Sequence, residues 1–176
     1  MSFPTTPAFV VHGDFSPATQ QHPGMKFLEA MKLDFDARRW TADYYAADFT
    51  WVAPNGQAYE GRDKALDALK AQYAPLTAHW HEPFYQICTP TDYGYEMIGS
   101  ATMWANLPGE PAAGETKKVD RNGTAWDVAG PGGFRFHIVK SGDSFQLSRM
   151  EVTADSGPVL MTMVKRGLLA AKDLGL

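Results

Sequence analysis

Apolar residues in the first half of the chain recur every three or four positions, which is the spacing of an amphipathic helix. One such run covers residues 27–35 and resumes at 40–45 after a possible break, and a second covers 65–73 behind Asp63, a candidate N-cap. A short aromatic and β-branched run at 48–52 lies between them and is typical of a strand. The pattern therefore predicts helix, short strand and helix, in that order.

The second half of the chain shows the alternation and the turn signals of strands. We expect strands at 81–88, 93–107, 124–128, 134–140 and 145–153, with a flexible glycine-rich link at 129–133 and a tight turn at 141–144. A helix over 158–174 follows. Helices gathered beside an antiparallel sheet indicate the α+β class, here a curved sheet wrapped with N-terminal helices into a cone, plus a C-terminal helix.

The longest predicted strand, 93–107, has to bend, and the glycines within it permit bending. A bent sheet closed by helices leaves a concavity, and concavities are where small ligands bind. The 176 residues fit one domain. We interpret residues 1–24 as an irregular N-terminal arm that docks on this domain, and residues 25–176 as the domain itself.

Charge and cysteine content narrow the choice of partner and compartment. The formal net charge is −4 and the basic residues are scattered, so we expect no nucleic-acid partner. The one cysteine, Cys88, rules out an intrachain disulfide. No basic leader precedes an apolar run at the start, and no stretch approaches the ~20 apolar residues of a membrane span. We therefore expect a cytoplasmic protein without a membrane contact.

Four short segments follow one another ahead of the strands: Asp36-Ala-Arg-Arg-Trp40, Tyr45-Ala-Ala-Asp-Phe-Thr-Trp51, Pro54-Asn-Gly56 and Tyr59-Glu-Gly-Arg62. With the strands behind them, they resemble the SnoaL-like domains of the nuclear-transport-factor-like superfamily, over residues 27–153. The resemblance implies a hollow cone, often dimeric, that holds a hydrophobic molecule against a few polar side chains. Enzymes of this kind are cyclases, dehydratases and isomerases that run on acid–base pairs without a metal or organic cofactor. The same fold also serves as a binding module.

The stretch His79–Tyr85 is the richest in groups suited to acid–base chemistry. His79 and His81 are two positions apart and share one face of a strand, and an imidazole beside a carboxylate moves protons near neutral pH. We therefore place His81 at the pocket as a catalytic residue, with Tyr85 two pleats further on. A solvent-facing strand start is the alternative.

The final hairpin supplies a second group of candidates. Arg135 and His137 share one strand face opposite an apolar one, and Arg149 and Glu151 share a face of the returning strand. We expect His137 and Glu151 to take part in catalysis and the two arginines to bind substrate. An ordinary cross-strand ion pair is the alternative for Arg149 and Glu151. On the catalytic hypothesis, His137→Ala abolishes turnover and leaves the fold intact.

Further candidates lie on other segments. Asp127 precedes the glycine-rich link and is a candidate catalytic carboxylate. Glu96 lies among apolar neighbours and is a candidate for substrate binding, with an exposed position at the strand end as the alternative. Arg38 either points into the cone, where it would polarise a substrate oxygen, or forms a surface ion pair. Trp51 and Trp104 are expected to form part of the cavity wall and contact the substrate.

Motifs of other chemistries do not occur in the chain. There is no His-Glu-x-x-His zinc motif, no Gly-x-x-x-x-Gly-Lys phosphate loop and no Gly-x-Ser-x-Gly elbow, and the five histidines have no metal-ligand spacing. We therefore expect no metal and no cofactor. The sequence favours a lyase or isomerase (dehydratase, cyclase or rearrangement) that acts as a homodimer on a hydrophobic oxygenated natural product such as a polyketide or terpenoid. A non-catalytic ligand-binding or dimerising module is the alternative.

Overall fold

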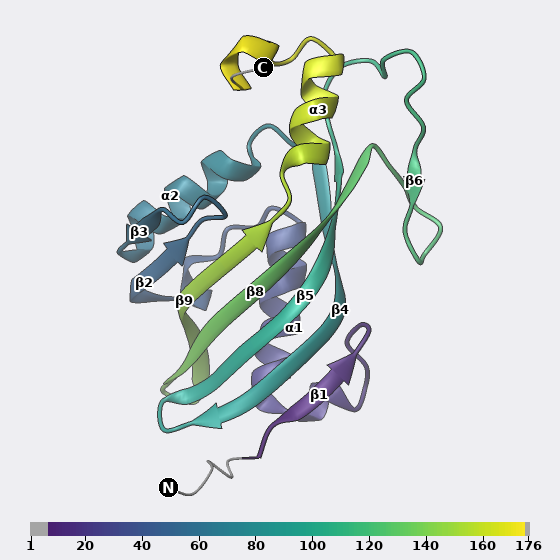
Figure 1. Cartoon of the computed structure of the whole chain (residues 1–176). Coiled ribbons are helices and arrows are strands. Elements are labelled where there is room, and N and C mark those ends of the chain that lie inside the picture. Colours follow the sequence, from purple (N-terminus) through teal and green to yellow (C-terminus); the bar gives the residue numbers. More distant parts are fainter. Residues whose placement is uncertain (1–6, 175–176) are drawn as a thin grey trace, which may run out of the picture.

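One curved sheet of seven strands, in the order β1-β4-β5-β8-β9-β2-β3, dominates the computed structural model, which describes residues 7–174 (Figure 1). Its strands are β1 (Phe9–His12), β2 (Tyr45–Val52), β3 (Ala58–Glu60), β4 (Ala78–Thr91), β5 (Gly94–Asn106), β8 (Val128–Ser141) and β9 (Ser144–Ala154). A separate pair is formed by β6 (Lys118–Val119) and β7 (Ala125–Trp126). The helices are α1 (Pro23–Asp36), α2 (Arg62–Tyr73) and α3 (Gly157–Lys165). The predicted α+β class is confirmed.

Helix α1 lies across the inner, concave face of the sheet and fills one side of the core (Figure 1). Pro23 occupies its first turn, and the His22 side chain accepts a hydrogen bond from the Met25 backbone N–H at 3.3 Å. Leu28 and Met31 then point into the sheet and are almost fully buried. Each such side chain contributes about 2 kcal/mol through removal of apolar surface from water. The helix ends at Asp36, which places that carboxylate at the edge of the core.

The segment after α1 is a strand rather than a continued helix. After one 3-10 turn at Ala42–Tyr44, strand β2 begins at Tyr45, and Phe49 and Trp51 are buried at alternate positions. The helical spacing predicted for 40–45 was therefore wrong. Strand β2 pairs in parallel with β9, while the other pairings in the sheet are antiparallel.

The glycine-rich segment 129–133 is part of strand β8, not the flexible link predicted from its composition. Gly130 pairs with Met103 and Gly132 pairs with Ala101 on the neighbouring strand β5. Continuous pairing with β5, joined from Gly132 onward by pairing with β9, supplies the backbone hydrogen bonds that a loop would lack. The tight turn predicted at 141–144 is confirmed, because Ser141 pairs with Ser144 across it.

The two ends of the described chain also differ in part from the sequence prediction. Residues 9–12 form edge strand β1 against β4, so the N-terminal arm does dock, although not as an irregular segment. Residues 1–6 of that arm lie outside the described part. Helix α3 stops at Lys165, well before 174, because Gly167 adopts φ 70°, a left-handed conformation that ends helices. Within residues 7–174, no helix has the length and apolarity needed to cross a membrane.

Candidate active site

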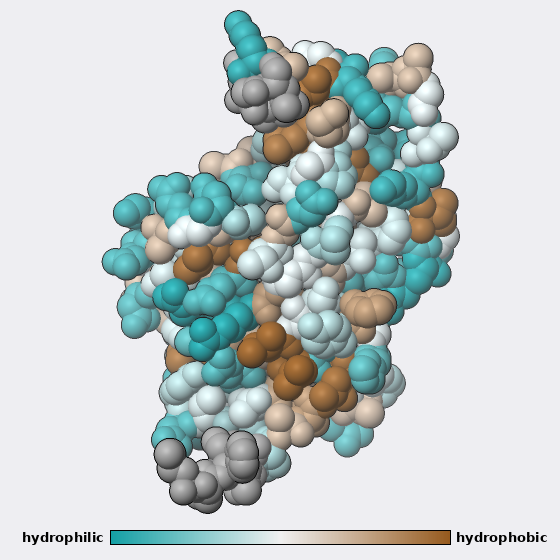
Figure 2. Space-filling model, in the orientation of Figure 1, coloured by the Kyte–Doolittle hydropathy of each residue, from teal (hydrophilic) through white to brown (hydrophobic). Residues whose placement is uncertain are grey.

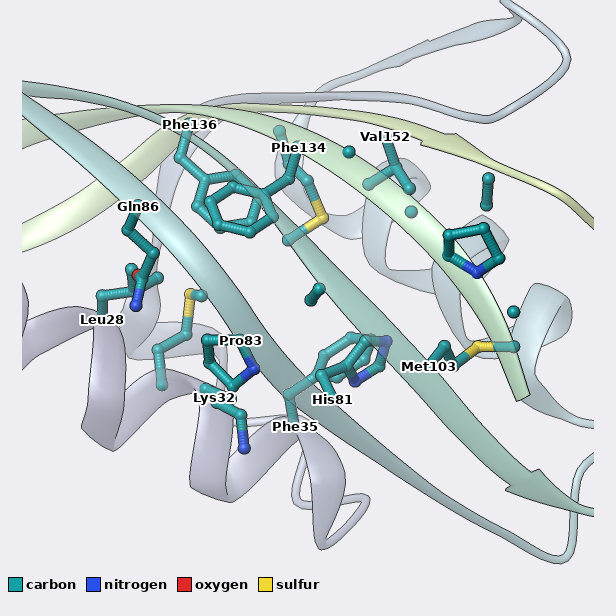
Figure 3. A pocket seen from close by; sticks show the side chains of 18 of the residues that line it. Leu28, Lys32, Phe35, His81, Pro83, Gln86, Met103, Phe134, Phe136 and Val152 are labelled. Carbon is teal, nitrogen blue, oxygen red and sulfur yellow. The ribbon is translucent and has the colours of Figure 1, made fainter. Parts of the chain in front are cut away.

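A pocket lies between α1 and the inner face of the sheet, with a volume of about 130 Å³. Figure 3 shows its wall, in which apolar side chains from α1, β4, β5, β8 and β9 face one another. Its polar side chains come from Lys32, Tyr73, His81, Gln86 and Asp155. A mostly apolar cavity with a few polar groups is the usual form of a small-molecule site.

The hollow arises because small residues occupy inward positions in the middle of the sheet. Gly130 and Gly132 lie on the same face of β8 as Phe134 and Phe136, and Gly132 pairs with Ala101 on β5. A glycine at an inward position leaves the space that a side chain would fill. The same Gly-Pro-Gly-Gly sequence that suggested a flexible link therefore forms one wall of the pocket.

The imidazole of His81 and the carboxylate of Asp36 form the central polar pair. Nδ1 of His81 lies 2.6 Å from Oδ1 of Asp36, and the backbone N–H of His81 donates to the same oxygen at 3.3 Å. Asp36 closes α1 and His81 opens the inward-facing part of β4, so the pair connects helix to sheet. A carboxylate accepts hydrogen bonds only, so Nδ1 carries the proton and Nε2 is the free base.

Asp36 is held in its charged form. Burial opposes ionisation, but the hydrogen bond from His81 and the charges of His81 and Lys32 outweigh it, so the pKa of Asp36 lies below its ordinary value. The ammonium of Lys32 lies 2.8 Å from Oδ2 of Asp36 and 3.2 Å from the centre of the Trp80 ring. Asp36 therefore supplies a fixed negative charge to the far side of His81.

The phenol of Tyr73 reaches the other nitrogen of His81. Its hydroxyl lies 3.1 Å from Nε2 and donates to this unprotonated nitrogen, and both residues line the pocket. Burial and the charge of Asp36 raise the pKa of Tyr73, so the phenol stays protonated. Tyr73 ends α2, and the guanidinium of Arg38 donates to its backbone carbonyl at 2.7 Å. Arg38 thus fixes this residue from outside the pocket instead of entering the cone.

His79 is buried behind the pair, with its side chain packed against Phe35 and Tyr73. Neither of its ring nitrogens has a hydrogen-bond partner within residues 7–174, and Nε2 lies 3.9 Å from Oδ1 of Asp36. Burial and the nearby charge of His81 lower the pKa of His79 to about 4, so the ring is neutral at pH 7. Donor atoms of Asp36, His79 and His81 lie within 4.8 Å of one another and are the residues here that could hold a metal ion. A cation there would replace the proton between Asp36 and His81.

A second cavity, of about 380 Å³, adjoins the pocket under α3. The two share the side chains of Tyr73, Met103, Met150 and Val152 as common walls. Trp51 lines this second cavity, stacked on Tyr59 with ring centres 5.2 Å apart. Trp51 is therefore a cavity-wall residue, as expected, but not of the cavity that contains His81.

Tyr85 lies on the opposite face of β4 from His81. The register of β4 against β5 shifts between Pro83 and Tyr85, which is a β-bulge at Phe84. The extra residue reverses the alternation, so Gln86 enters the pocket and Phe84 is 71% exposed. The prediction that placed Tyr85 with His81 assumed an unbroken alternation and is corrected by the bulge.

Candidates from the final hairpin lie together on the outer face of the sheet, not in the cone. Their guanidinium groups form ion pairs there: Nε of Arg135 lies 2.6 Å from Glu96, and Nε of Arg149 lies 2.5 Å from Glu151. His137 lies beside them, 4.0 Å from Glu96, and burial lowers its pKa. Figure 2 views this outer face, on which hydrophilic and hydrophobic surface lie side by side. The expectation that this strand face lines the cone is therefore corrected.

Asp127 and Trp104 are held by other partners. The carboxylate of Asp127 accepts from the Leu107 backbone N–H at 2.8 Å and pairs with Arg166 at 2.9 Å, which ties α3 to the sheet. Trp104 donates from its indole N–H to Glu82 at 2.7 Å, and neither residue is part of the pocket wall. Of the residues selected from sequence as catalytic, the structure brings His81 into the pocket.

The sequence analysis did not select four polar residues of the pocket wall, Lys32, Tyr73, Gln86 and Asp155, nor Asp36, which pairs with His81. Asp36 was interpreted as a surface partner of nearby arginines, yet it and Lys32 are four positions apart, a spacing that places both on one helix face. The sequence did contain one signal for Asp36: it is an acidic residue at the end of a helix whose apolar face is buried. Tyr73 and Gln86 carried no signal, because their positions depend on a helix end and on a bulge.

Comparison with known proteins supports the same architecture. No family model and no curated protein matches the chain. Among solved structures, a putative dehydratase of the NTF2-like family from Streptomyces avermitilis has a TM-score of 0.62 at 11% identity, over 79% of this chain and 99% of its own. A putative scytalone dehydratase from Novosphingobium aromaticivorans has a TM-score of 0.59 at 10% identity, over 78% and 85%.

Two further solved structures with a similar fold carry other names. A hexachlorocyclohexane dehydrochlorinase, LinA-type3 from Novosphingobium barchaimii, has a TM-score of 0.58 at 11% identity, over 78% of this chain and 88% of its own. A protein from Catenulispora acidiphila in complex with S-DNPA has a TM-score of 0.56 at 14% identity, over 81% and 98%. At sequence identities this low, the similarity shows a shared fold and no shared activity. The chain has the NTF2-like, or cystatin-like, cone fold.

Proposed function

We propose that this protein is a cofactor-independent lyase or isomerase that uses His81 and Asp36 to move a proton within an apolar, oxygenated substrate. The observation that carries the proposal is the arrangement around one imidazole: a buried carboxylate 2.6 Å from Nδ1, a phenol 3.1 Å from Nε2, and an apolar pocket in front. A natural product such as a polyketide or terpenoid is the substrate class that this apolar wall fits.

Proton abstraction begins at Nε2 of His81. This nitrogen takes a proton from a substrate C–H, and the electrons of that bond form an enolate or a new double bond. Asp36 holds Nδ1–H in place and stabilises the imidazolium that results, as the carboxylate does in other His–Asp pairs. The hydroxyl of Tyr73 has to leave Nε2 when the substrate C–H approaches that nitrogen, and the phenol, which stays protonated, then donates its hydrogen bond to the developing oxyanion beside His81.

The fate of that proton decides the reaction. Return of the proton to a departing hydroxyl gives water and an alkene, which is a dehydration. Return to another carbon gives an isomer, and in both cases atoms and charge balance without an added reactant. The similar structures named as dehydratases and as a dehydrochlorinase support an elimination or a related proton transfer.

Hydrogen–deuterium exchange tests the proposal without knowledge of the natural substrate. The protein is incubated in D₂O with a panel of enolisable bicyclic ketones, and incorporation of deuterium is followed by mass spectrometry. We expect exchange with the native protein and a loss of at least 100-fold in His81→Asn. The matched control is His137→Asn on the outer face, which should exchange like the native protein.

Equal exchange in the native protein and His81→Asn would overturn the assignment of the base. Tight binding of the ketones without any exchange would favour the ligand-binding alternative instead. Loss of exchange in His137→Asn would return the catalytic role to the outer face of the sheet.

The homodimer is also a proposal. The outer face of the sheet exposes large apolar side chains at Val10, Phe84, Tyr93 and Ile98, next to the ion pairs of Glu96 and its neighbours. Exposed apolar surface of this kind is typical of protein contacts. Sedimentation velocity of the native chain and of Phe84→Ser, with Ile98→Ser as a second variant, would test this contact. A native monomer would contradict it.

A further inference from the structure

The amide of Gln86 is buried in the pocket without any hydrogen-bond partner. Gln86 is 1% exposed, and both its Nε2 and its Oε1 lack a partner among the described residues. A buried amide normally finds partners, because an unpaired donor and an unpaired acceptor each cost free energy comparable to a lost hydrogen bond. The carboxamide of Gln86 can therefore bind a ligand group that accepts a hydrogen bond from Nε2 and donates one to Oε1.

The surroundings of Gln86 make it the polar group of an otherwise apolar end of the cavity. Figure 3 shows it on β4 at the end of the pocket where Leu28 and Phe136 lie, while His81 lies beside Phe35 and Met103. The strand rises about 3.3 Å per residue, so five positions separate the two groups by on the order of 15 Å along the wall. A ligand that contacts both is several rings long.

The β-bulge at Phe84 places this amide in the pocket. Without the register shift between Pro83 and Tyr85, Tyr85 would face inward and Gln86 would face out. The bulge thus replaces a large aromatic phenol with a flexible carboxamide, and it does so on the same strand that presents His81.

We propose that Gln86 determines substrate specificity by recognising a hydroxyl group on a neutral, fused-ring or similarly extended apolar substrate. A hydroxyl donates one hydrogen bond and accepts another, which matches the acceptor Oε1 and the donor Nε2 of one carboxamide. A carboxylate only accepts and would leave Oε1 unpaired. Among the described residues that line the pocket, the one lysine or arginine is Lys32, and it is already paired with Asp36 at 2.8 Å.

This inference rests on the proposed function, since it assumes that the pocket in front of His81 is the substrate site. Binding is measured separately from turnover, so the two ideas fail in different ways. His81→Asn should lose deuterium exchange and keep its preference for a hydroxyl group. Gln86→Leu should lose that preference.

Three naphthalene probes test the recognition by isothermal titration calorimetry. They are 2-naphthol, 2-methylnaphthalene, in which a methyl group of similar size replaces the hydroxyl, and 2-naphthoate, which offers acceptors and a negative charge. We expect the native protein to bind 2-naphthol about tenfold to a hundredfold more tightly than either of the others. In Gln86→Leu, 2-methylnaphthalene should bind at least as tightly as 2-naphthol.

Control variants separate recognition from folding. Gln57→Leu changes an exposed glutamine on a turn and should leave the preference intact. Gln86→Met keeps the length of the side chain and removes both polar atoms, so it should behave like Gln86→Leu if the latter is poorly folded. Equal binding of 2-naphthol and 2-methylnaphthalene by the native protein, tighter binding of 2-naphthoate, or an unchanged preference in both Gln86 variants would overturn the proposal. Failure of all three probes to bind would overturn it as well.

Discussion

Nδ1 of His81 lies 2.6 Å from Oδ1 of Asp36, although the two residues are 45 positions apart in the chain. One closes α1 and the other lies near the start of β4, so the contact exists only when helix and sheet have docked. The proposed catalytic pair is therefore assembled only when the chain folds.

Asp36→Asn should lower the rate of deuterium exchange by about 10³-fold or more, because an amide at this position neither fixes Nδ1–H nor stabilises an imidazolium. The pKa of Asp36 lies below its ordinary value, so Asp36 should stay ionised throughout the pH range in which His81 is unprotonated and can act as the base. The control is Asp34→Asn, which removes a carboxylate that pairs with the exposed Arg39 at 2.6 Å. Full exchange activity in Asp36→Asn would contradict the role of the pair.

Tyr73→Phe should reduce exchange about tenfold to a hundredfold and leave the fold intact, because the hydroxyl reaches Nε2 while the ring remains packed on Phe35. The pKa of Tyr73 is raised by burial, so the native rate should show no alkaline loss from this phenol below pH 10. Tyr59→Phe is the control, since that ring stacks on Trp51 in another part of the molecule. An unchanged rate in Tyr73→Phe would restrict Tyr73 to a structural role.

The sequence predicted the class of fold and one member of the proposed catalytic pair, His81. Alternation and turn signals located the long strands, because each of those signals is local, and His81 was selected for its chemistry and its place at a strand start. Asp36 was visible as the first residue of a segment that carries the family resemblance and as a charge near Arg38 and Arg39, with nothing to connect it to His81. Its partner lies beyond β2, β3 and α2, and no local pattern reports such a contact.

The choice of strand face was the step that sequence could not make. The alternating pattern of β8 and β9 separates two faces of the sheet but does not say which one is inward. In the sequence, the residues of the ion pairs on the outer face look the same as polar residues of an apolar pocket. A single bulge on β4 then exchanged Tyr85 for Gln86. Register and bulges depend on pairing between strands, so they appear only in three dimensions.

Removal of metal ions should leave exchange unchanged. In the proposed mechanism the proton between Asp36 and His81 occupies the place that a cation would take, so dialysis against EDTA should not alter the rate. Metal content by mass spectrometry before and after dialysis completes the measurement. Loss of activity that zinc restores would instead assign a metal to Asp36, His79 and His81, and would contradict the expectation of a cofactor-free enzyme.

The neutral, buried His79 makes the protein sensitive to mild acid. Its pKa is about 4 in the folded protein, whereas an unfolded histidine titrates near 6.5, so the unfolded chain takes up this proton first. The contribution of His79 is therefore fully retained above about pH 6.5 and falls as the pH drops toward 4, by about 3 kcal/mol in total. Urea unfolding of the native protein and of His79→Phe at several pH values measures this contribution to the free energy of unfolding. Parallel pH dependences of the two proteins would contradict it.

The carboxylate of Asp127 makes the stability of the fold depend on pH at a lower pH than His79 does. Hydrogen bonds from Arg166 and the Leu107 backbone outweigh the effect of burial and lower the pKa of Asp127 to about 2, below the value near 3.9 of an unfolded aspartate. A depressed carboxylate pKa stabilises the fold fully above pH 4 and loses that effect as the pH falls toward 2. Asp127→Asn should therefore be less stable than the native protein by about 3 kcal/mol at pH 7.

The same comparison at pH 2.5 should show a much smaller difference, because protonation then removes the ion pair from the native protein as well. Asp92→Asn, on an exposed hairpin turn, serves as the control and should match the native protein at both pH values. Arg166 joins α3 to the end of β5 through Asp127 and the Leu107 carbonyl. Asp127→Asn should therefore also increase the rate at which the backbone amides of α3 exchange their hydrogens. Unchanged exchange in α3 together with unchanged stability would contradict Asp127 as the link between α3 and the sheet.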